Sequence, residues 1–363
     1  VKVIDRPVMQ VLALLLTAAA LLFGWANNRD FSALLEQKFY DDPIVYKKTT
    51  RYQHLVMTHN SKIDDTRLYI NGNTQFSSLD EGRYHDFLVH PVMTVAPAIK
   101  HVLVLGGGDG LALREIIKYT EVESVTLVDL DPEMINIAMN NQILTGLNNH
   151  SFQHAKVNVE SINTYVAGSK QAIYMREVGH EIGEREWVAS VDVFNIDADQ
   201  FLKKQPEQKW DAVVIDLPDP SSIELSKLYS KQFYQSLRRY LTADAYVAIQ
   251  STSPYHAKEA FLSIGETLTA AGFKVLPYRQ NIPSFGDWGY YLAWIGTRSS
   301  EAVKLQLSSL AEFKVDTGFI TPELLAASFA FGKGELVADN PCVNTLMQPC
   351  LLTNYLDRSW LLE

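Results

Sequence analysis

The sequence predicts an α/β protein built on a doubly wound, mostly parallel sheet. The first observation is an apolar, strand-like run at residues 102–105 that leads into a glycine-rich loop at 106–110 and then into helical spacing at 111–119. The second is that predicted strands and helices alternate from His101 onward, an order typical of parallel sheets. A strand, a glycine loop and a helix N-terminus in succession form the nucleotide-binding corner of such a sheet.

The other strands of the sheet are predicted from short apolar runs separated by helical segments. They are expected at residues 124–128, 191–195, 212–215 and 246–250, with an antiparallel pair at 274–277 and 290–294. Ahead of the sheet, residues 44–75 alternate apolar and polar side chains, and Asn71-Gly72 is a strong hairpin signal. A small antiparallel β subdomain is therefore predicted before the main sheet.

Four regions are expected along the chain. They are a helix and linker at 1–43, the β subdomain at 44–95, the sheet domain at 96–300 and a helical extension at 301–363. A polar stretch at about 151–190 is longer than an ordinary connection, so it is predicted to be a lid or a decorative insertion. In the extension, Thr321 is suited to cap a helix whose first residue is Pro322.

The N-terminal region contains an uncharged run at residues 8–26, long enough to cross a bilayer as a helix. Lys2 and Arg6 lie before it and Arg29 after it, so the flanking charges give no firm orientation. A signal peptide and a buried core helix are the alternatives, and we expect a transmembrane helix. Because the first residue is Val rather than Met, we also expect a longer precursor with further spans upstream.

Composition narrows the possible partners. The formal net charge of −10 over 363 residues argues against nucleic acid, which requires a basic surface. Cys342 and Cys350 are the only cysteines in the sequence, and no metal-ligand spacing of Cys and His is present. We therefore expect no metal site, no disulfide framework and a reducing compartment.

The glycine loop carries an acid, Asp109, which would repel phosphate and attract a cation. A dinucleotide-binding fingerprint would place its third glycine at position 111 or 113, where leucines stand, so a dehydrogenase is disfavoured. Asp129 ends the second strand about twenty residues later, where a carboxylate can accept hydrogen bonds from ribose hydroxyls. Asp131 is better suited to capping the helix that begins near Pro132.

The position of the loop acid also separates two classes of sulfonium-using enzyme. S-adenosylmethionine methyltransferases commonly carry an acid two residues before the first glycine, a position that Val104 holds here. S-adenosylmethionine ends in an amino-acid zwitterion, whereas its decarboxylated form ends in a bare aminopropyl cation. A carboxylate at Asp109 suits that cation better, because their charges are opposite.

A second pair of acids, Asp216 and Asp219, follows the fourth predicted strand on a loop with two prolines. Ligands bind at this carboxyl edge in doubly wound folds. An amine nucleophile is protonated near neutral pH, and attack on a sulfonium carbon requires its free lone pair. Asp216 is placed to take the proton, and Asp219 to orient the amine or to cap the turn with Pro220.

Several motifs in series resemble the spermidine synthase (polyamine aminopropyltransferase) family. They are Tyr52-Gln53, Gly72-Asn-Thr-Gln75, Asp80-Glu81, Tyr84-His85-Asp86, Gly106-Gly-Gly-Asp-Gly110, Val128-Asp-Leu-Asp131, Asp197-Ala198, Asp216-Leu-Pro-Asp-Pro220 and Leu228-Tyr-Ser-Lys-Gln-Phe-Tyr234. The resemblance covers about residues 44–298 and implies a Rossmann-like sheet of the S-adenosylmethionine-methyltransferase type. Segments at 250–255 and 283–290, and the tail after Thr321, resemble the membrane-anchored bacterial branch.

The resemblance implies a role for each matching residue. Those that would bind decarboxylated S-adenosylmethionine are Gln53, Gly106, Gly108, Asp109, Asp129, Asp197 and Ala198. Those that would hold the acceptor amine are Tyr84, His85 and Asp219, with Gln75 beside the aminopropyl chain. Asp216 would be the proton acceptor. No tightly bound cofactor is implied, because the sulfonium compound is a co-substrate.

Three departures from the family pattern concern the acceptor. Phe285 stands where the family usually has Tyr, Thr252 where some members carry an acid, and Asp86 where the usual residue is Glu. The expected function is transfer of the aminopropyl group to an amine such as putrescine, giving spermidine and methylthioadenosine. The alternatives are an S-adenosylmethionine-dependent small-molecule methyltransferase and a non-catalytic, membrane-tethered polyamine sensor. A homodimer at the inner membrane, with its catalytic domain facing the cytoplasm, is the expected assembly.

Overall fold

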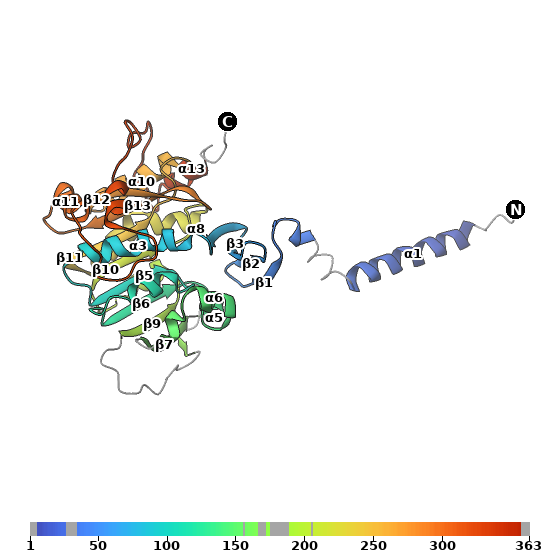
Figure 1. Ribbon diagram of the computed structural model, residues 1–363. Helices are drawn as coiled ribbons and strands as arrows, with labels where there is room; N and C mark the ends of the chain where they lie inside the picture. The colour runs from blue at the N-terminus through green and yellow to red at the C-terminus, as the bar shows by residue number, and fades with distance from the viewer. Residues whose placement is uncertain are drawn as a thin grey trace.

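The computed structural model describes residues 6–26, 35–154, 157–165, 172–174, 189–204 and 206–356. Its centre is a nine-stranded sheet with the order β12-β13-β11-β10-β5-β6-β9-β7-β8 (Figure 1). The strands are β5 (His101–Gly106), β6 (Ser124–Asp129), β7 (Val157–Tyr165), β8 (Ala172–Tyr174), β9 (Ala189–Asn195), β10 (Trp210–Asp216), β11 (Leu241–Gln250), β12 (Lys274–Ile282) and β13 (Gly286–Trp294). The six from β11 to β7 are parallel, and β13, β12 and β8 are antiparallel to their neighbours. The predicted parallel sheet with an antiparallel pair at its edge is confirmed.

The order of the strands creates a switch point beside β5. From β5 the chain builds outward through β6 and β9, and it then returns to add β10 and β11 on the other side. As a result β5 and β10 are neighbours in the sheet, and the connections that follow them in the chain lead to opposite sides. Ligands of doubly wound sheets bind at the carboxyl ends of such strands.

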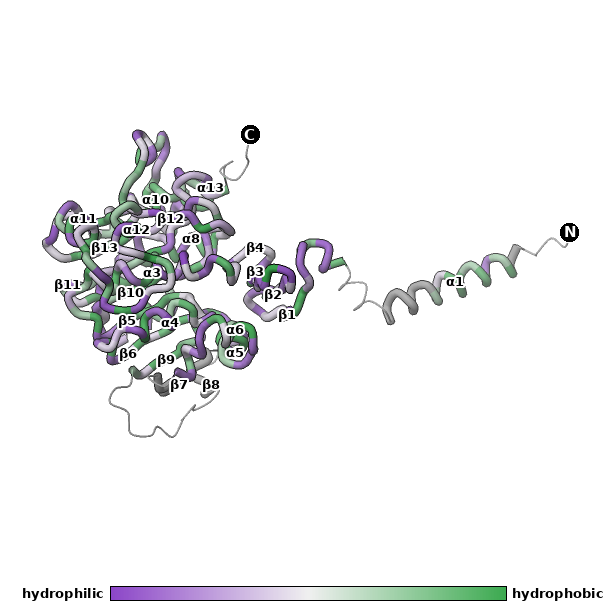
Figure 2. Tube along the Cα trace, viewed as in Figure 1, coloured by the Kyte–Doolittle hydropathy of each residue, from purple (hydrophilic) through white to green (hydrophobic). Residues whose placement is uncertain are grey.

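Each face of the sheet carries its own apolar core, because successive side chains of a strand point to opposite faces. On β5, Val102 and Val104 pack into one core, and Leu103 and Leu105 into the other. Figure 2 shows the apolar character of the central strands. The helices of the sheet domain are α3 (Glu81–Val95), α4 (Leu111–Ile116), α5 (Pro132–Asn140), α6 (Gln142–Leu147), α7 (Ala198–Lys203), α8 (Ile223–Ser226), α9 (Lys231–Arg238) and α10 (Lys258–Ala270), with short 3-10 turns at Ser151–Gln153 and Lys227–Tyr229.

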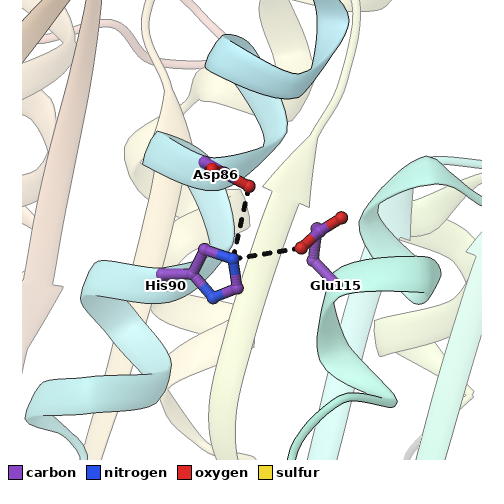
Figure 3. A group of neighbouring side chains, drawn as sticks. All are labelled: Asp86, His90 and Glu115. Carbon is purple, nitrogen blue, oxygen red and sulfur yellow. Dashed lines mark hydrogen bonds and ion pairs between the residues drawn. The ribbon is translucent and has the colours of Figure 1, made fainter. Parts of the chain in front are cut away.

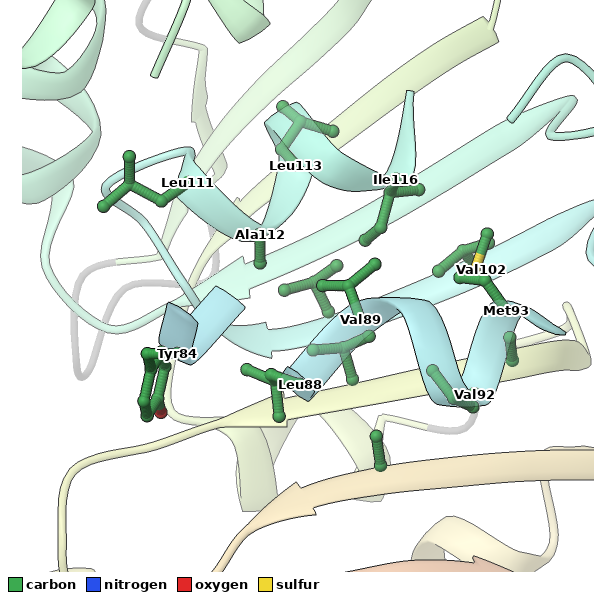
Figure 4. Close-up of a cluster of buried hydrophobic side chains, with 14 of the residues drawn as sticks. Tyr84, Leu88, Val89, Val92, Met93, Val102, Leu111, Ala112, Leu113 and Ile116 are labelled. Atoms are coloured by element: carbon green, nitrogen blue, oxygen red, sulfur yellow. The ribbon is translucent and has the colours of Figure 1, made fainter. Parts of the chain in front are cut away.

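Helices α3 and α4 cover the first face of the sheet together. Their apolar side chains meet those of β5 in the cluster of Figure 4, which includes Leu88, Val92, Val102 and Ile116. Tyr84 lies at the N-terminal end of α3 in the same view. The packing of α3 on α4 and on the sheet therefore fixes where the first turn of α3 lies.

A separate antiparallel sheet precedes the main domain, as predicted. Its strands, in the order β1-β2-β3-β4, are β1 (Ile44–Thr49), β2 (His54–Asn60), β3 (Asp65–Ile70) and β4 (Asn73–Ser77). Asn71 and Gly72 join the last two strands with positive φ values of 52° and 84°, which is what a two-residue hairpin turn requires. This sheet is tied to the main domain where Thr50 Oγ1 donates to Asp131 Oδ2 at 2.7 Å and Tyr46 OH to Glu133 Oε1 at 2.7 Å.

Up to residue 356, where the described part ends, the C-terminal extension forms three short helices joined by long irregular segments. They are α11 (Ser300–Ser308), α12 (Pro322–Ser328) and α13 (Cys350–Leu356). Thr321 caps α12 as predicted, since its hydroxyl accepts the Leu324 N–H at 3.3 Å. The expectation that the cysteines stay reduced is wrong: Cys342 and Cys350 form a disulfide, because the extension folds back and brings them together.

The N-terminal run is helical, as predicted, and forms α1 (Arg6–Ala26). The predicted membrane span is not supported, because no helix within the described part of the chain is both long enough and apolar enough to cross a bilayer. Of the predicted insertion, residues 157–165 and 172–174 form β7 and β8 at the edge of the sheet. The polar core of that insertion, residues 175–188, lies outside the described residues, and so do residues 27–34 of the linker.

Candidate active site

The site lies where β5 and β10 end side by side at the carboxyl edge of the sheet. The strand register pairs Gly106 with Asp216, so the glycine loop begins beside the loop that follows β10. On the other side of β5, the pairing of β6 brings Asp129 to the same edge. Acids from three separate strand ends therefore converge at the switch point, as the motif spacing predicted.

Two glycines of the loop are required by close packing. A Cβ on Gly106, whose φ is 83°, would lie 2.0 Å from the carbonyl oxygen of Asp216. A Cβ on Gly108 would lie 2.5 Å from Asp129 Oδ2, and instead the Gly108 N–H donates to that oxygen at 3.1 Å. These contacts are within the protein, so a role of both glycines in binding a co-substrate stays a prediction.

Asp129 and Asp131, the two acids at the end of β6, have different partners. Asp129 Oδ1 accepts the Asp131 N–H at 2.9 Å, and burial raises the pKa of Asp129 to about 7 against the lowering effect of this hydrogen bond. Asp131 caps α5 by accepting the Glu133 N–H at 3.0 Å. The predicted capping role of Asp131 is confirmed, which leaves Asp129 as the acid of this strand end that is available to a ligand.

Asp109 is the acid within the glycine loop. Its Oδ1 accepts the Leu111 N–H at 2.9 Å, and the Asn148 side chain donates to its carbonyl oxygen at 2.9 Å. Burial raises the pKa of Asp109 to about 6, while the positive charge of His85 lowers it and the charge of Asp216 raises it. A ligand cation beside this carboxyl would therefore favour its ionised form.

Helix α3 brings Tyr84 and His85 to the same edge. The Tyr84 hydroxyl donates to Asp216 Oδ1 at 2.6 Å. Burial and the charge of Asp216 raise the pKa of Tyr84 well above 10, so Tyr84 stays a donor at neutral pH. His85 Nε2 lies 3.9 Å from the other carboxylate oxygen, Oδ2 of Asp216. Asp216 is thus oriented by two neighbours from a helix that lies more than a hundred residues earlier in the chain.

His85 is held by a chain of ion pairs that joins α3 to α4. Its Nδ1 lies 2.9 Å from Glu81 Oε2, and both oxygens of Glu81 accept from Arg114, at 2.8 and 2.9 Å. Burial alone would lower the pKa of His85, but Glu81, Asp109 and Asp216 raise it to about 9. His85 is therefore a buried cation beside the carboxylates of the site at neutral pH.

Asp219 lies three residues beyond Asp216 and accepts hydrogen bonds from three different segments. Gln250 Nε2 donates to Oδ1 at 3.3 Å, while Thr252 Oγ1 and Tyr355 OH donate to Oδ2 at 3.2 and 3.0 Å. Burial raises the pKa of Asp219 to about 6, and these three donors oppose that rise. No pattern near Tyr355 indicates a role in the site, because this residue lies in the extension, 136 positions from Asp219.

The Thr252 backbone is strained at this point. Its φ of 58° is in the left-handed region, which a β-branched residue rarely occupies, and its side chain is fully buried. The Gly289 N–H donates to its carbonyl oxygen at 2.7 Å and helps to hold this conformation. In this conformation the Thr252 hydroxyl donates to Asp219.

Four of the predicted site residues lie at a distance from this acidic cluster or are engaged elsewhere. Asp197 caps α7 and pairs with Lys227 at 2.8 Å, and Ala198 is buried as the first residue of that helix. Gln53 lies in the turn between β1 and β2, and the Gln75 amide donates to the Asn73 carbonyl at 3.2 Å. In the part of the chain that is described, neither glutamine side chain hydrogen bonds to the cluster, and the roles predicted for all four stay predictions.

The apolar residue Phe285 lies next to the site. Its ring is 6.0 Å from that of Tyr84, in an edge-to-face arrangement, and 4.9 Å from that of Trp288. Asp80 fixes the loop that carries it by accepting the Ser284 N–H at 2.6 Å and the Ser284 hydroxyl at 2.9 Å. The Phe285 side chain therefore forms an apolar wall beside Tyr84 and offers no hydrogen bond there.

Asp86, His90 and Glu115 form a second buried group, on α3 and α4 (Figure 3). Each offers one oxygen or nitrogen atom, and these atoms lie within 4.8 Å of one another. His90 Nε2 is 3.0 Å from Glu115 Oε2 and 3.3 Å from Asp86 Oδ1. Burial alone would lower the pKa of His90, but the two carboxylates raise it.

The surroundings of this group already compensate its charge. Glu115 pairs with Arg114 at 2.7 Å and with Lys118 at 2.5 Å. Asp86 Oδ2 accepts the N–H groups of Phe319 and Ile320, at 2.5 and 2.9 Å. The group therefore joins α3 to α4 and to the C-terminal extension. Asp86, which stands where the family usually has the longer Glu, contacts the extension here rather than the predicted acceptor site.

Comparison with known proteins agrees with this geometry. The family model described as the spermine/spermidine synthase domain matches residues 81–173 and 187–306. The chain belongs to this family. It is 36% identical over 297 residues to polyamine aminopropyltransferase 2 of Bacillus cereus, which covers 82% of this chain and 69% of that protein.

Other relatives match nearly the whole chain but only part of their own length. The polyamine aminopropyltransferases of Oceanobacillus iheyensis and Streptomyces coelicolor (enzyme 1) are each 35% identical, covering 95% and 99% of this chain and 58% and 59% of those proteins. This family member thus spans somewhat more than half the length of those relatives.

Solved structures share the fold. The crystal structure of a spermidine synthase in complex with the transition-state analogue AdoDATO has a TM-score of 0.62 at 20% identity, covering 81% of this chain and 88% of that one. Spermidine synthase from Thermotoga maritima has a TM-score of 0.61, also at 20% identity, covering 81% and 87%. The Rossmann-like sheet with an antiparallel N-terminal sheet is therefore confirmed as the fold.

Proposed function

We propose that this family member is a polyamine aminopropyltransferase, which transfers the aminopropyl group of decarboxylated S-adenosylmethionine to a diamine such as putrescine. The observation that carries the proposal is the register of β5 and β10, which sets Asp216 directly beside the glycine loop that contains Asp109. This arrangement provides one carboxylate for the cation of the donor and another for the attacking amine. The relatives named polyamine aminopropyltransferase support the same reaction.

The donor would bind along the glycine loop. Asp129 would accept hydrogen bonds from the ribose hydroxyls, and the ligand's donors would favour ionisation of a carboxyl whose pKa burial has raised to about 7. Asp109 would hold the ammonium end of the aminopropyl chain. Asp197 at the start of α7 and Gln53 in the N-terminal sheet would complete the adenosine end, as the family resemblance implies.

The acceptor would lie across from the donor, between Asp216 and Asp219. Asp219 would hold the distal ammonium group of the diamine, and Asp216 would take a proton from the nearer one to free its lone pair. Tyr84 donates to one oxygen of Asp216 and thereby leaves the other for this proton. The charge of His85 would favour the ionised form of Asp109, whose pKa it lowers.

Displacement then occurs at the carbon bound to the sulfonium. The nitrogen lone pair forms the new C–N bond, and the C–S bond breaks with its electrons going to sulfur, which leaves as the neutral thioether methylthioadenosine. The positive charge passes from sulfur to nitrogen, where the carboxylates can stabilise it. Holding both substrates in line supplies much of the acceleration.

An assay of the products tests the proposal. The whole protein is incubated with putrescine and decarboxylated S-adenosylmethionine, and methylthioadenosine is measured. We expect turnover, with kcat reduced by about 10²–10⁴ in Asp216→Asn, because the variant cannot accept the proton. Asp64→Asn, at a side chain that is 96% exposed, is the matched control and should retain activity.

Two results would overturn the proposal. Production of S-adenosylhomocysteine from S-adenosylmethionine, without methylthioadenosine, would show a methyltransferase. Tight polyamine binding with neither product would show a sensor. Location at the inner membrane and assembly as a homodimer stay predictions, which fractionation of cells that express the full-length protein, and its mass in solution, would test.

A further inference from the structure

The far end of the predicted amine site is built by the C-terminal extension. Tyr355 lies on α13 and donates to Asp219 Oδ2 at 3.0 Å. The family model ends at residue 306, well before this helix. A residue outside the matched domain thus contacts a carboxylate inside it.

Helix α13 is fixed to the body of the protein, so this contact is not that of a loose tail. Leu351 is fully buried in the core on the α9 and α10 face of the sheet. Asn354 Nδ2 donates to Ser263 Oγ on α10 at 2.9 Å, and the Cys342–Cys350 disulfide closes the segment just before the helix. These contacts hold the residues directly before Tyr355 in place and thereby position its hydroxyl.

Within the described chain, Asp219 has only neutral donors as hydrogen-bond partners. Gln250, Thr252 and Tyr355 share its two oxygens, and Tyr229 is the other titratable group whose pKa the charge of Asp219 affects. The pKa of Tyr229 lies well above 10, so Tyr229 carries no charge at neutral pH. No cation is among the causes that shift the pKa of Asp219. A cationic ligand would therefore be the partner that neutralises this carboxylate.

We infer that Tyr355 is a positioning residue that sets the preference of this site for diamines over monoamines, by orienting Asp219 toward the distal ammonium group. The inference rests on the proposed function. A hydrogen bond from a neutral donor to a carboxylate stabilises the ionised form and fixes which oxygen faces the ligand. Without the Tyr355 hydroxyl, Asp219 would lose one of three donors, and its pKa would rise further above the ordinary value.

The variant Tyr355→Phe tests this role with the smallest possible change. The whole protein is assayed with decarboxylated S-adenosylmethionine and two acceptors that have the same four-carbon chain. These are putrescine and n-butylamine, and n-butylamine lacks the distal ammonium group. We expect kcat/KM for putrescine to fall about tenfold through a higher KM, the size expected for one charge-assisted hydrogen bond. We expect the value for n-butylamine to change less than twofold.

A pH profile gives a second readout that a purely structural role would not alter. The acid limb of kcat/KM for putrescine should move to higher pH by about half a unit to one unit in Tyr355→Phe, because Asp219 would protonate more easily. The matched control is Tyr240→Phe, which removes a hydroxyl that donates to the Leu202 carbonyl at 3.0 Å. Tyr240 directly precedes β11, so it lies at the opposite end of that strand from the carboxyl edge. This control should match the wild type with both acceptors.

The outcomes separate this inference from the proposed function. If the wild type forms methylthioadenosine and Tyr355→Phe keeps the same ratio of putrescine to n-butylamine activity, the inference is wrong and the function stands. An equal fall with both acceptors would show a structural role for Tyr355 and would also overturn it. If the wild type makes no methylthioadenosine, the proposed function fails and the inference fails with it.

Discussion

At the scale of single residues, the site is a set of carboxyl groups whose surroundings differ. Burial raises the pKa of Asp109 and Asp219 to about 6 and that of Asp129 to about 7. His85 is the buried cation among them, with a pKa of about 9. The excess of acid over base in this small region favours ligands with several positive charges, which describes both predicted substrates.

Asp109 should determine which sulfonium compound binds. We expect Asp109→Asn to weaken binding of decarboxylated S-adenosylmethionine by about 10–100-fold, because the variant loses a charge-assisted contact with the ammonium group. Binding of S-adenosylmethionine, whose zwitterion gains less from the carboxylate, should change less than threefold. Calorimetric titration with each compound measures both values.

The contrast between the two ligands is the informative result. An equal loss for both would show that Asp109 shapes the loop, through its hydrogen bond to the Leu111 N–H, rather than selecting the ligand. Asp64→Asn again serves as the control for a lost carboxylate.

At the scale of elements, the connection between α3 and α4 carries the site. Arg114 on α4 pairs with Glu81 at the start of α3 and with its neighbour Glu115, and its side chain is only 14% exposed. Glu81 in turn holds His85. The two helices are therefore joined by a buried ion-pair network as well as by the apolar cluster of Figure 4.

Removing Arg114 should loosen this joint. We expect Arg114→Met to lower the free energy of unfolding by about 3 kcal/mol, because Glu81 and Glu115 each lose one of their ion-pair partners. Glu81 keeps His85, and Glu115 keeps His90 and Lys118. Arg114→Lys, which keeps the charge but cannot form the fork, should lose less. Urea unfolding monitored by fluorescence measures both, and a loss below about 1 kcal/mol in the methionine variant would contradict the assigned role.

The elements were largely predictable, because strand and helix signals are local. Seven of the nine strands of the main sheet, the Asn71-Gly72 turn and the caps at Asp131 and Thr321 all follow from patterns of a few residues. The predicted membrane span, which such a pattern also suggested at residues 8–26, is not supported by the described helices.

Contacts between distant segments were not predictable in the same way. The acids of the site were found because each follows a strand, and parallel strands end at one edge. Neither the pairing of Glu81 with Arg114 nor that of Cys342 with Cys350 has such a rule, because both depend on how helices and the extension pack. Tyr355 was missed for this reason: nothing near it in the sequence indicates a site.

At the scale of the whole molecule, binding of substrate and of protons should be linked. Near pH 6, Asp109 and Asp219 are partly protonated in the free protein, because their pKa values are raised to about 6. A bound diamine would favour the ionised form of Asp219 and so lower its pKa, as the sulfonium donor would for Asp109. Binding must then release protons in this pH range.

Calorimetry in buffers of different ionisation enthalpy measures this release. We expect putrescine, added to the protein saturated with methylthioadenosine, to release protons at pH 6 and few at pH 7.5, where the carboxyls are already ionised and His85 keeps its proton. Asp219→Asn should reduce the release at pH 6. A release that is the same at both pH values would contradict the linkage.

The contact of Tyr355 with Asp219 also has a consequence for biosynthesis. The two residues are 136 positions apart, which a ribosome translating at about 5–20 residues per second covers in roughly 7–27 seconds. During that interval the nascent chain already contains every acid of the cluster, from Asp109 to Asp219. All the carboxylates of the cluster are therefore made before the hydroxyl that orients one of them.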